Sequence, residues 1–227
     1  AALANIQGSD SVTLVKTSIA GNFPDKNIGT GRTVQVSGLT LSGTDAGNYT
    51  LTQPTTTADI TAATLTVTGV TGVDKVYNRT TTATLNTGSA ALSGIQGSDS
   101  VTLTTSGYAA SFANWNVGSA KTLTVTGMTI SGTDAGNYTL TQPSPTASIT
   151  AAALTVLGVT ANNKVYDANT TASLNLGSAY FSGVYSGDTS TINTASAAGA
   201  FSTAAVGTAK SITVSGISAS GSDAANY

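Results

Sequence analysis

Apolar and polar residues alternate with a period of two along most of the chain, which is the pattern of half-buried β-strands. In the segment KTLTVTGMTI the alternation slips by one position at Gly127, and the same slip occurs at Gly38 and Gly216. Glycine at such a slip suits a β-bulge, which lets both halves of a strand keep facing the core. We therefore expect these three glycines to have a structural role.

Gly, Asn and Asp residues separate the strand-like stretches at intervals typical of all-β domains. In the middle of the chain these stretches are residues 64–70, 80–85, 100–105, 121–131, 137–142 and 146–150. No segment places apolar residues at helical spacing. The pattern predicts all-β modules with an immunoglobulin-like β-sandwich fold. Modules of the β-grasp type, in which a helix packs across the sheet, are the alternative.

A long internal repeat organises the chain. The segment at residues 42–54 recurs letter for letter at 131–143, an offset of 89 positions, and no insertion or deletion interrupts this register. A period of this length indicates independent domains rather than the coils of a solenoid. We predict an elongated tandem array with a partial repeat at 1–61, a complete repeat at 62–150 and a partial repeat at 151–227.

The two outer repeats are predicted to be incomplete, because the first lacks the opening strands and the third lacks the closing one. The sequence is therefore expected to be a window on a longer array. Truncated repeats should expose sheet edges that pair with other chains. The joints at Ala62-Ala63 and Ala151-Ala152 are short, so we expect consecutive repeats to keep a fixed twist, with a spacing of roughly 30–40 Å.

Each repeat carries an aspartate followed four positions later by a tyrosine. The pairs are Asp45 with Tyr49, Asp134 with Tyr138, and Asp223 with Tyr227. This D-x-[GA]-x-Y spacing resembles the tyrosine corner of immunoglobulin-like domains, in which the phenol hydrogen-bonds to nearby backbone. We assign the six residues a structural role, with ligand stacking as the alternative for the tyrosines.

The chemistry available to the chain is narrow, because it has no His, no Cys and no Glu, and charged residues make up only 8% of it. Histidine and environment-tuned glutamate carry much acid–base catalysis, and His or Cys ligands hold zinc and iron. This composition argues against an enzyme, a cofactor or a metal site. The single carboxylates at Asp99, Asp134 and Asp167 fit Asx turns better than calcium loops, which gather several ligands.

Other partner classes are also disfavoured. A net charge of −2 with dispersed basic residues argues against nucleic acid, and no apolar stretch is long enough to insert into a membrane. The only tryptophan, Trp115, aligns with Lys26 and Ala204 in the other repeats, a variation that a core position would not accept. We expect Trp115 on the surface, as a contact for a sugar or a neighbouring filament or as a tolerated loop substitution.

Three motifs together resemble the YDG-type repeat of bacterial filamentous-haemagglutinin-like surface adhesins: ALTVLGVTANNKVYDANTTASL, F-x-x-x-x-[VI]-G and LSGTDAGNYTLTQP. The resemblance covers essentially the whole chain. Lys164 to Asp167 match the family's K-V-Y-D, with Ala168-Asn169 in place of a glycine. The second repeat departs further, because it reads Lys75-Val76-Tyr77-Asn78-Arg79. The resemblance implies an extracellular protein displayed on the bacterial cell surface.

Two functions remain open. The first is a structural segment of a secreted adhesin, in which the repeats form an extended stalk or filament that presents a binding region. The second is a binding module of an extracellular filament or biofilm matrix, whose partners are host or matrix glycans, or neighbouring repeats of the same or another copy of the chain. We do not expect an enzyme, because no catalytic residue can be named and catalysis seldom needs one site several times in series.

Overall fold

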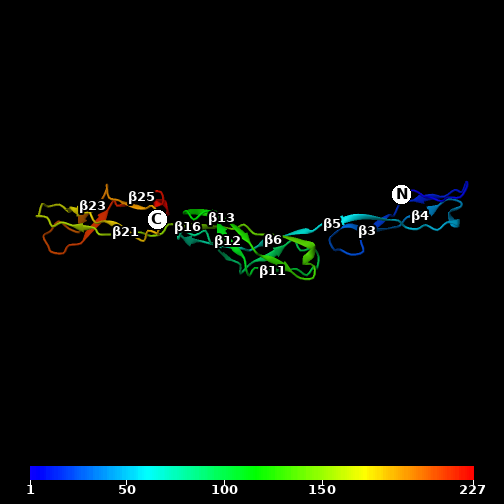
Figure 1. The fold of residues 1–227 in the computed structure, drawn as a ribbon, viewed down its shortest axis with the longest axis horizontal. Coiled ribbons are helices and arrows are strands. Elements are labelled where there is room, and N and C mark those ends of the chain that lie inside the picture. Colours follow the sequence, from blue (N-terminus) through cyan, green and yellow to red (C-terminus); the bar gives the residue numbers. More distant parts are fainter. The chain divides into compact units, whose positions relative to one another are not determined.

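The computed structural model describes residues 1–227 and contains β-strands and three single-turn 3₁₀ helices, with no α-helix (Figure 1). This confirms the prediction that the chain is all-β. The β-grasp alternative requires a helix that packs across a sheet, and the structure has no such helix.

The three repeats contain the following elements, and some short strands of one repeat have no counterpart in another. The first repeat contains β1 (Thr13–Val15), β2 (Ala20–Asn22), β3 (Gly29–Ser37), β4 (Thr40–Ser42), η1 (Ala46–Asn48) and β5 (Thr55–Ile60). The second contains β6 (Ala63–Thr68), β7 (Thr71–Val73), β8 (Lys75–Val76), β9 (Thr84–Asn86), β10 (Ala91–Ser93), β11 (Thr102–Thr104), β12 (Ala109–Phe112), β13 (Gly118–Thr126), β14 (Thr129–Ser131), η2 (Ala135–Asn137), β15 (Tyr138–Thr141) and β16 (Thr146–Thr150). The third contains β17 (Thr155–Leu157), β18 (Thr160–Ala161), β19 (Thr171–Ala172), β20 (Leu174–Asn175), β21 (Tyr180–Ser182), β22 (Thr191–Asn193), β23 (Ala198–Phe201), β24 (Ile212–Ser215), β25 (Ser218–Ser220) and η3 (Ala224–Asn226).

Tertiary contacts group the chain into two compact units. The first unit comprises residues 1–67, 92–104 and 129–141, and the second comprises residues 68–91, 105–128 and 142–227. Each unit therefore joins one outer repeat to part of the middle repeat, so the contacts between consecutive repeats lie inside the units.

The first unit holds four small sheets. Its sheets are β1-β4, β2-β3-β5, β10-β6-β15 and β11-β14. Strand β15 runs parallel to β6, with Tyr138 opposite Ala63, whereas β1 and β4 are antiparallel. The parallel pair begins where the 3₁₀ turn η2 ends, so it holds that turn beside the joint between the first two repeats.

The second unit is built around a four-stranded sheet in the order β12-β13-β16-β8. Five smaller sheets complete it: β7-β9, β17-β21, β18-β20, β19-β23-β24 and β22-β25. In β13 the side chains of Leu123 and Val125 are buried, and the three threonines that alternate with them are exposed. The period-two pattern of the sequence therefore places this strand with one face in the core.

Strand register repeats with the sequence. Thr13 pairs with Ser42 in the first repeat, Thr102 with Ser131 in the second, and Thr191 with Ser220 in the third. The buried apolar side chains are less evenly distributed. All of them except Leu39, Ala152 and Ala172 lie between residues 62 and 150.

The three glycines at the phase slip lie between two strands rather than inside a bulged one. Strand β13 ends at Thr126 and β14 begins at Thr129, and Gly127 between them has a φ of +85°. Gly38 and Gly216 have similar positive φ values, which favour glycine because it has no Cβ. The observed register shift in β13 lies between Gly118 and Lys121 instead.

Candidate functional site: the interface between consecutive repeats

The tyrosine after each 3₁₀ turn links two loops at one end of its repeat. In the second repeat, the Tyr138 hydroxyl donates a hydrogen bond to Asp99 Oδ2 at 2.7 Å and accepts one from the Gln96 N–H at 2.9 Å. These partners lie 39 and 42 residues upstream, much further along the chain than the corner partner in an immunoglobulin domain. Burial and the Asp99 carboxylate raise the pKa of Tyr138.

The aspartate of the motif makes the second link between the same loops. Asp134 Oδ2 accepts a hydrogen bond from the Ser100 N–H at 2.9 Å, and Asp45 and Asp223 accept equivalent bonds. The tyrosine contacts also recur, between Tyr49 and Asp10 at 2.7 Å and between Tyr227 and Asp188 at 2.6 Å. We call this end of a repeat the head surface. In the second repeat it consists of Gln96, Asp99, Asp134, Asn137 and Tyr138, and its counterparts lie 89 positions away in the other repeats.

Two loops form the opposite end of the repeat, which we call the tail surface. In the second repeat they are residues 76–80 and 113–118, and a lysine holds each of them. Lys75 Nζ donates to the carbonyl of Thr80 at 2.9 Å and lies 5.9 Å from the centre of the Phe112 ring. Burial lowers the pKa of Lys75. Lys121 holds the other loop in the same way, because its Nζ donates a hydrogen bond to Asn114 Oδ1 at 2.6 Å.

In the first unit, the tail surface of the first repeat contacts the head surface of the second. The backbone N–H of Ile28 donates to Asn137 Oδ1 at 3.0 Å. Lys26 Nζ pairs with Asp99, and with Asp134 at 2.6 Å. The hydrogen bonds that Lys26 donates to Asp99 and Asp134, together with its charge, hold the pKa of both carboxyl groups below the usual value.

In the second unit, the same contact recurs between the second and third repeats. The backbone N–H of Val117 donates to Asn226 Oδ1 at 3.0 Å. Both residues lie 89 positions after their counterparts in the first interface, and each hydrogen bond joins residues 109 apart. Asn226 is 5% exposed, so the interface covers it. The head-to-tail contact is therefore a repeated feature of the chain.

Tyr77 adds an aromatic anchor to the second interface. Its side chain is 0% exposed, and its ring makes edge-on contacts with Tyr185 and Tyr227 at centroid distances of 5.8 and 5.5 Å. Its hydroxyl donates to Asp188 Oδ2 at 2.7 Å. Burial, followed by the hydrogen bond to this carboxylate, raises the pKa of Tyr77 well above its usual value. A neutral phenol buried among other tyrosines stabilises an interface by apolar contact and by one charge-assisted bond.

Asp188 is the electrostatic centre of this interface. Its side chain is 2% exposed, and its carboxylate accepts bonds from the phenols of Tyr77 and Tyr227 and pairs with Arg79 Nε at 2.8 Å. Burial acts to raise the pKa of Asp188, but the two phenols and the Arg79 charge outweigh it, so that its pKa is lowered. The buried carboxylate therefore has two phenol donors and a neighbouring cation, which offset the cost of removing its charge from water.

Trp115 lies in the tail loop of the second repeat and is 41% exposed. It lines a small cavity that also contains Asp223. Its counterpart Lys26 lies at the first interface beside Asp134, which is itself the counterpart of Asp223. The position therefore belongs to the tail surface, where a cation at the first interface is replaced by an indole at the second.

Sequence reasoning did not identify Asn137, Tyr77 or Asp188 as interface residues. One signal was available for the asparagine, because Asn48, Asn137 and Asn226 are identical in the three repeats although a 3₁₀ turn does not require an amide there. For Tyr77 no signal was available, because its counterpart Tyr166 follows the same Lys-Val pair in the sequence but has a different environment.

The structure contains no cluster of three or more His, Cys, Asp or Glu side chains that could hold a metal ion. No helix in it is long and apolar enough to cross a membrane.

Comparison with known proteins identifies one family. The YDG domain matches the chain in three segments, at residues 1–58, 61–147 and 150–227. No curated protein and no solved structure matches the chain significantly.

Proposed function

The chain belongs to the YDG domain family, and from this premise we propose that it is a structural repeat segment of a secreted bacterial surface adhesin. In this proposal each repeat is an immunoglobulin-like sandwich, and consecutive repeats form an extended stalk or filament on the outside of the cell. The stalk presents a binding region carried elsewhere on the protein.

The observation that carries the proposal is the repeated head-to-tail contact. The bond from Ile28 to Asn137 and the bond from Val117 to Asn226 have the same length of 3.0 Å and the same sequence register. A joint held by side chains on both of its faces restricts bending more than a short linker alone does. Repeats that meet in the same way at every joint extend in a regular array, which is the mechanical property that a stalk needs.

Small-angle scattering of the 227-residue chain tests the stalk. Three repeats in line, at roughly 30–40 Å each, give a rod with a radius of gyration of about 30 Å. A compact globule of this length has a radius of gyration of about 17 Å and would contradict the proposal. Asn137→Ala should broaden the distribution of shapes, because it removes the acceptor for Ile28. Asn86→Ala is the matched control, because the Asn86 side chain accepts a hydrogen bond only within its own turn, from the Gly88 N–H.

The location is tested separately on intact cells that express the full-length protein. Protease added outside the cells should remove the repeat segment while a cytoplasmic marker survives. Protection of the segment until the cells are lysed would contradict surface display.

A further inference from the structure

The two observed interfaces differ at one carboxylate of the head surface. In the first interface, Asp134 Oδ1 pairs with Lys26 Nζ at 2.6 Å, while Asp134 Oδ2 accepts a hydrogen bond from the Ser100 N–H. In the second interface, the counterpart Asp223 uses its Oδ2 in the same way and accepts the Thr189 N–H at 2.8 Å. Asp223 Oδ1 makes no hydrogen bond and no ion pair. The second interface therefore contains a carboxylate that lacks the cation of the first.

One difference in sequence removes that cation. Lys26 corresponds to Trp115 in the next repeat, 89 positions later. Arg79 also reaches across the second interface from the tail surface, but it pairs with Asp188. Asp223 therefore lies beside an indole at the position where its counterpart in the first interface lies beside an ammonium group.

The space beside Asp223 is a cavity of about 460 Å³, whose lining includes Trp115, Asn116 and Thr81. Trp115 is 41% exposed, so the cavity is open to solutes. Asn116 makes its hydrogen bonds through its backbone N–H and carbonyl, which leaves its side-chain amide for a ligand. An indole face attracts a cation through its π electrons, and a carboxylate accepts charge-assisted hydrogen bonds from it. This combination of groups fits a cationic ligand.

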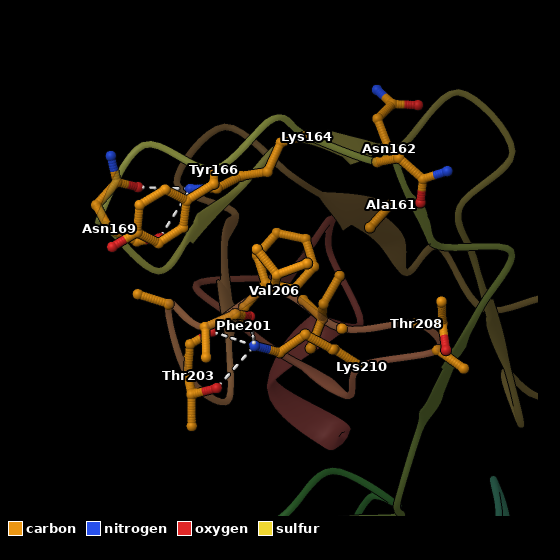
Figure 2. A pocket seen from close by; sticks show the side chains of 16 residues that line it. Ala161, Asn162, Lys164, Tyr166, Asn169, Phe201, Thr203, Val206, Thr208 and Lys210 are labelled. Carbon is orange, nitrogen blue, oxygen red and sulfur yellow. Dashed lines mark hydrogen bonds between the residues drawn. The ribbon is translucent and has the colours of Figure 1, made fainter.

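The lysine on the loop that carries Trp115 does not neutralise Asp223. Lys121 Nζ donates a hydrogen bond to Asn114 Oδ1 at 2.6 Å and so holds its own loop. Figure 2 shows the same arrangement in the third repeat, where Lys210 Nζ donates to the carbonyl of Thr203 at 2.6 Å. The loop is therefore ordered before any ligand binds, and little conformational entropy is lost on binding.

The first interface shows which chemical group this position accepts. The hydrogen bonds to Asp134 and then to Asp99 raise the pKa of Lys26, so the two carboxylates stabilise the protonated amine. Lys26 also keeps 59% of its side chain exposed, although the strand that follows η2, β15, is present there. Residues that follow the 3₁₀ turn therefore do not close this position, and a ligand can reach it from solvent.

We propose that the cavity lined by Trp115 and Asp223 binds a primary alkylammonium group supplied from outside the chain, of the kind that ends a lysine side chain. The ammonium group donates a hydrogen bond to Asp223 Oδ1, and its alkyl stem lies against the indole of Trp115. The site binds one cation, because Arg79 already neutralises Asp188. This inference goes beyond the stalk proposal and does not depend on it.

Trp115 is the only tryptophan, so its fluorescence reports on this cavity alone. Titration of the native chain with n-butylammonium chloride, which is protonated at pH 7, should give a saturable change with a dissociation constant on the order of millimolar. The neutral analogue n-butanol should bind about tenfold more weakly. Added salt should weaken the binding of n-butylammonium, because it screens a partly exposed charge pair.

A second titration distinguishes the two sources of such a group. The probe is a tripeptide with a central lysine and blocked ends. Tighter binding of the tripeptide than of n-butylammonium would assign the natural ligand to a polypeptide. Equal affinity of the two probes would assign it to a free amine, and either result supports the site.

Two variants test the assigned residues. Asp223→Asn removes the charge and should weaken the binding of n-butylammonium about tenfold or more. Asp45→Asn is the matched control, because Asp45 accepts the equivalent backbone bond, from the Ser11 N–H, but lies outside the cavity. Trp115→Lys introduces the residue of the first interface, so its own ammonium group should occupy the site. Saturation-transfer NMR should then detect no bound n-butylammonium in this variant.

Circular dichroism checks that each variant is folded, and Trp115→Lys carries the test should Asp223→Asn fail that check. The native chain may not lack a saturable response, since its absence would overturn the proposal. Undiminished binding in Asp223→Asn or Trp115→Lys, or equal binding of n-butanol, would overturn it as well. Methyl glucoside that binds more tightly than n-butylammonium would instead assign the cavity to a sugar stacked on Trp115, and the ammonium site would be wrong.

Discussion

The hydroxyl of Tyr77 donates a hydrogen bond of 2.7 Å to Asp188, a residue 111 positions further along the chain and in the next repeat. The same carboxylate accepts the phenol of Tyr227 at 2.6 Å from its own repeat. One aspartate therefore links Tyr227 in the head surface of the third repeat to the tail loop of the second. Replacing either Tyr77 or Asp188 and measuring unfolding should therefore show how much this contact stabilises the interface.

Tyr77→Phe should lower the stability of the second unit by about 1 kcal/mol, because it deletes one hydrogen bond to a carboxylate that keeps its other partners. Urea unfolding followed by the fluorescence of Trp115, which lies in the same unit, measures the loss. Tyr166→Phe is the matched control, because this exposed counterpart makes no such bond. An equal loss in both variants would show that the phenol of Tyr77 has no part in the interface.

Asp188→Asn should destabilise the chain by about 2 kcal/mol, because it replaces a buried carboxylate that accepts two phenol hydrogen bonds and pairs with the partly exposed Arg79. The counterpart change Asp10→Asn should cost less, because Asp10 accepts a phenol but faces no cation. Differential scanning calorimetry of the two variants beside the native chain measures the difference. A larger loss for Asp10→Asn would contradict the role assigned to Asp188.

The first interface should weaken at acid pH. Lys26 holds the pKa of Asp99 and Asp134 below the usual value of 3.8, so both carboxylates favour the folded state when they are ionised. Their contribution is fully present above the unfolded-state pKa and is lost as the pH falls through the lowered folded-state pKa. Thermal unfolding measured from pH 7 to pH 2 should show this loss, and Lys26→Met should make the acid slope shallower. If the acid slope of Lys26→Met equals that of the native chain, the ion pairs of Lys26 are not the cause of the acid destabilisation.

Gly38→Ala should destabilise the first unit by at least about 2 kcal/mol. Its φ of +83° is unfavourable for alanine, and an added Cβ would lie 2.0 Å from the carbonyl oxygen of Ser18. Gly47→Ala is the control, because nothing lies within 4 Å of a Cβ there and the third repeat already has Ala225 at that position. Chemical denaturation of both variants measures the contrast, and similar stabilities would show that the strand break tolerates a side chain.

The sequence alone was sufficient for the features that depend on local pattern. Period-two alternation around residues such as Leu123 and Val125 predicted strands, because side chains on a pleated strand point alternately to its two faces. The offset of 89 positions predicted a repeated architecture, and the strand register does repeat at that offset. The sequence also indicated that Gly127 has to be a glycine. We expected a β-bulge at this position, and the structure has a break between two strands instead.

Only the tertiary structure decided which residues join one repeat to the next. Tyr77 and Tyr166 occupy the same position of the repeat, yet one is buried and the other is exposed, because burial depends on whether a head surface lies against the tail loop. Asp10 and Asp188 likewise occupy the same position of the repeat, but only Asp188 pairs with a cation, because Arg79 comes from a loop that is distant in sequence. The repeated sequence specifies the fold of each repeat, whereas an interface forms only where surfaces of two different repeats contact each other.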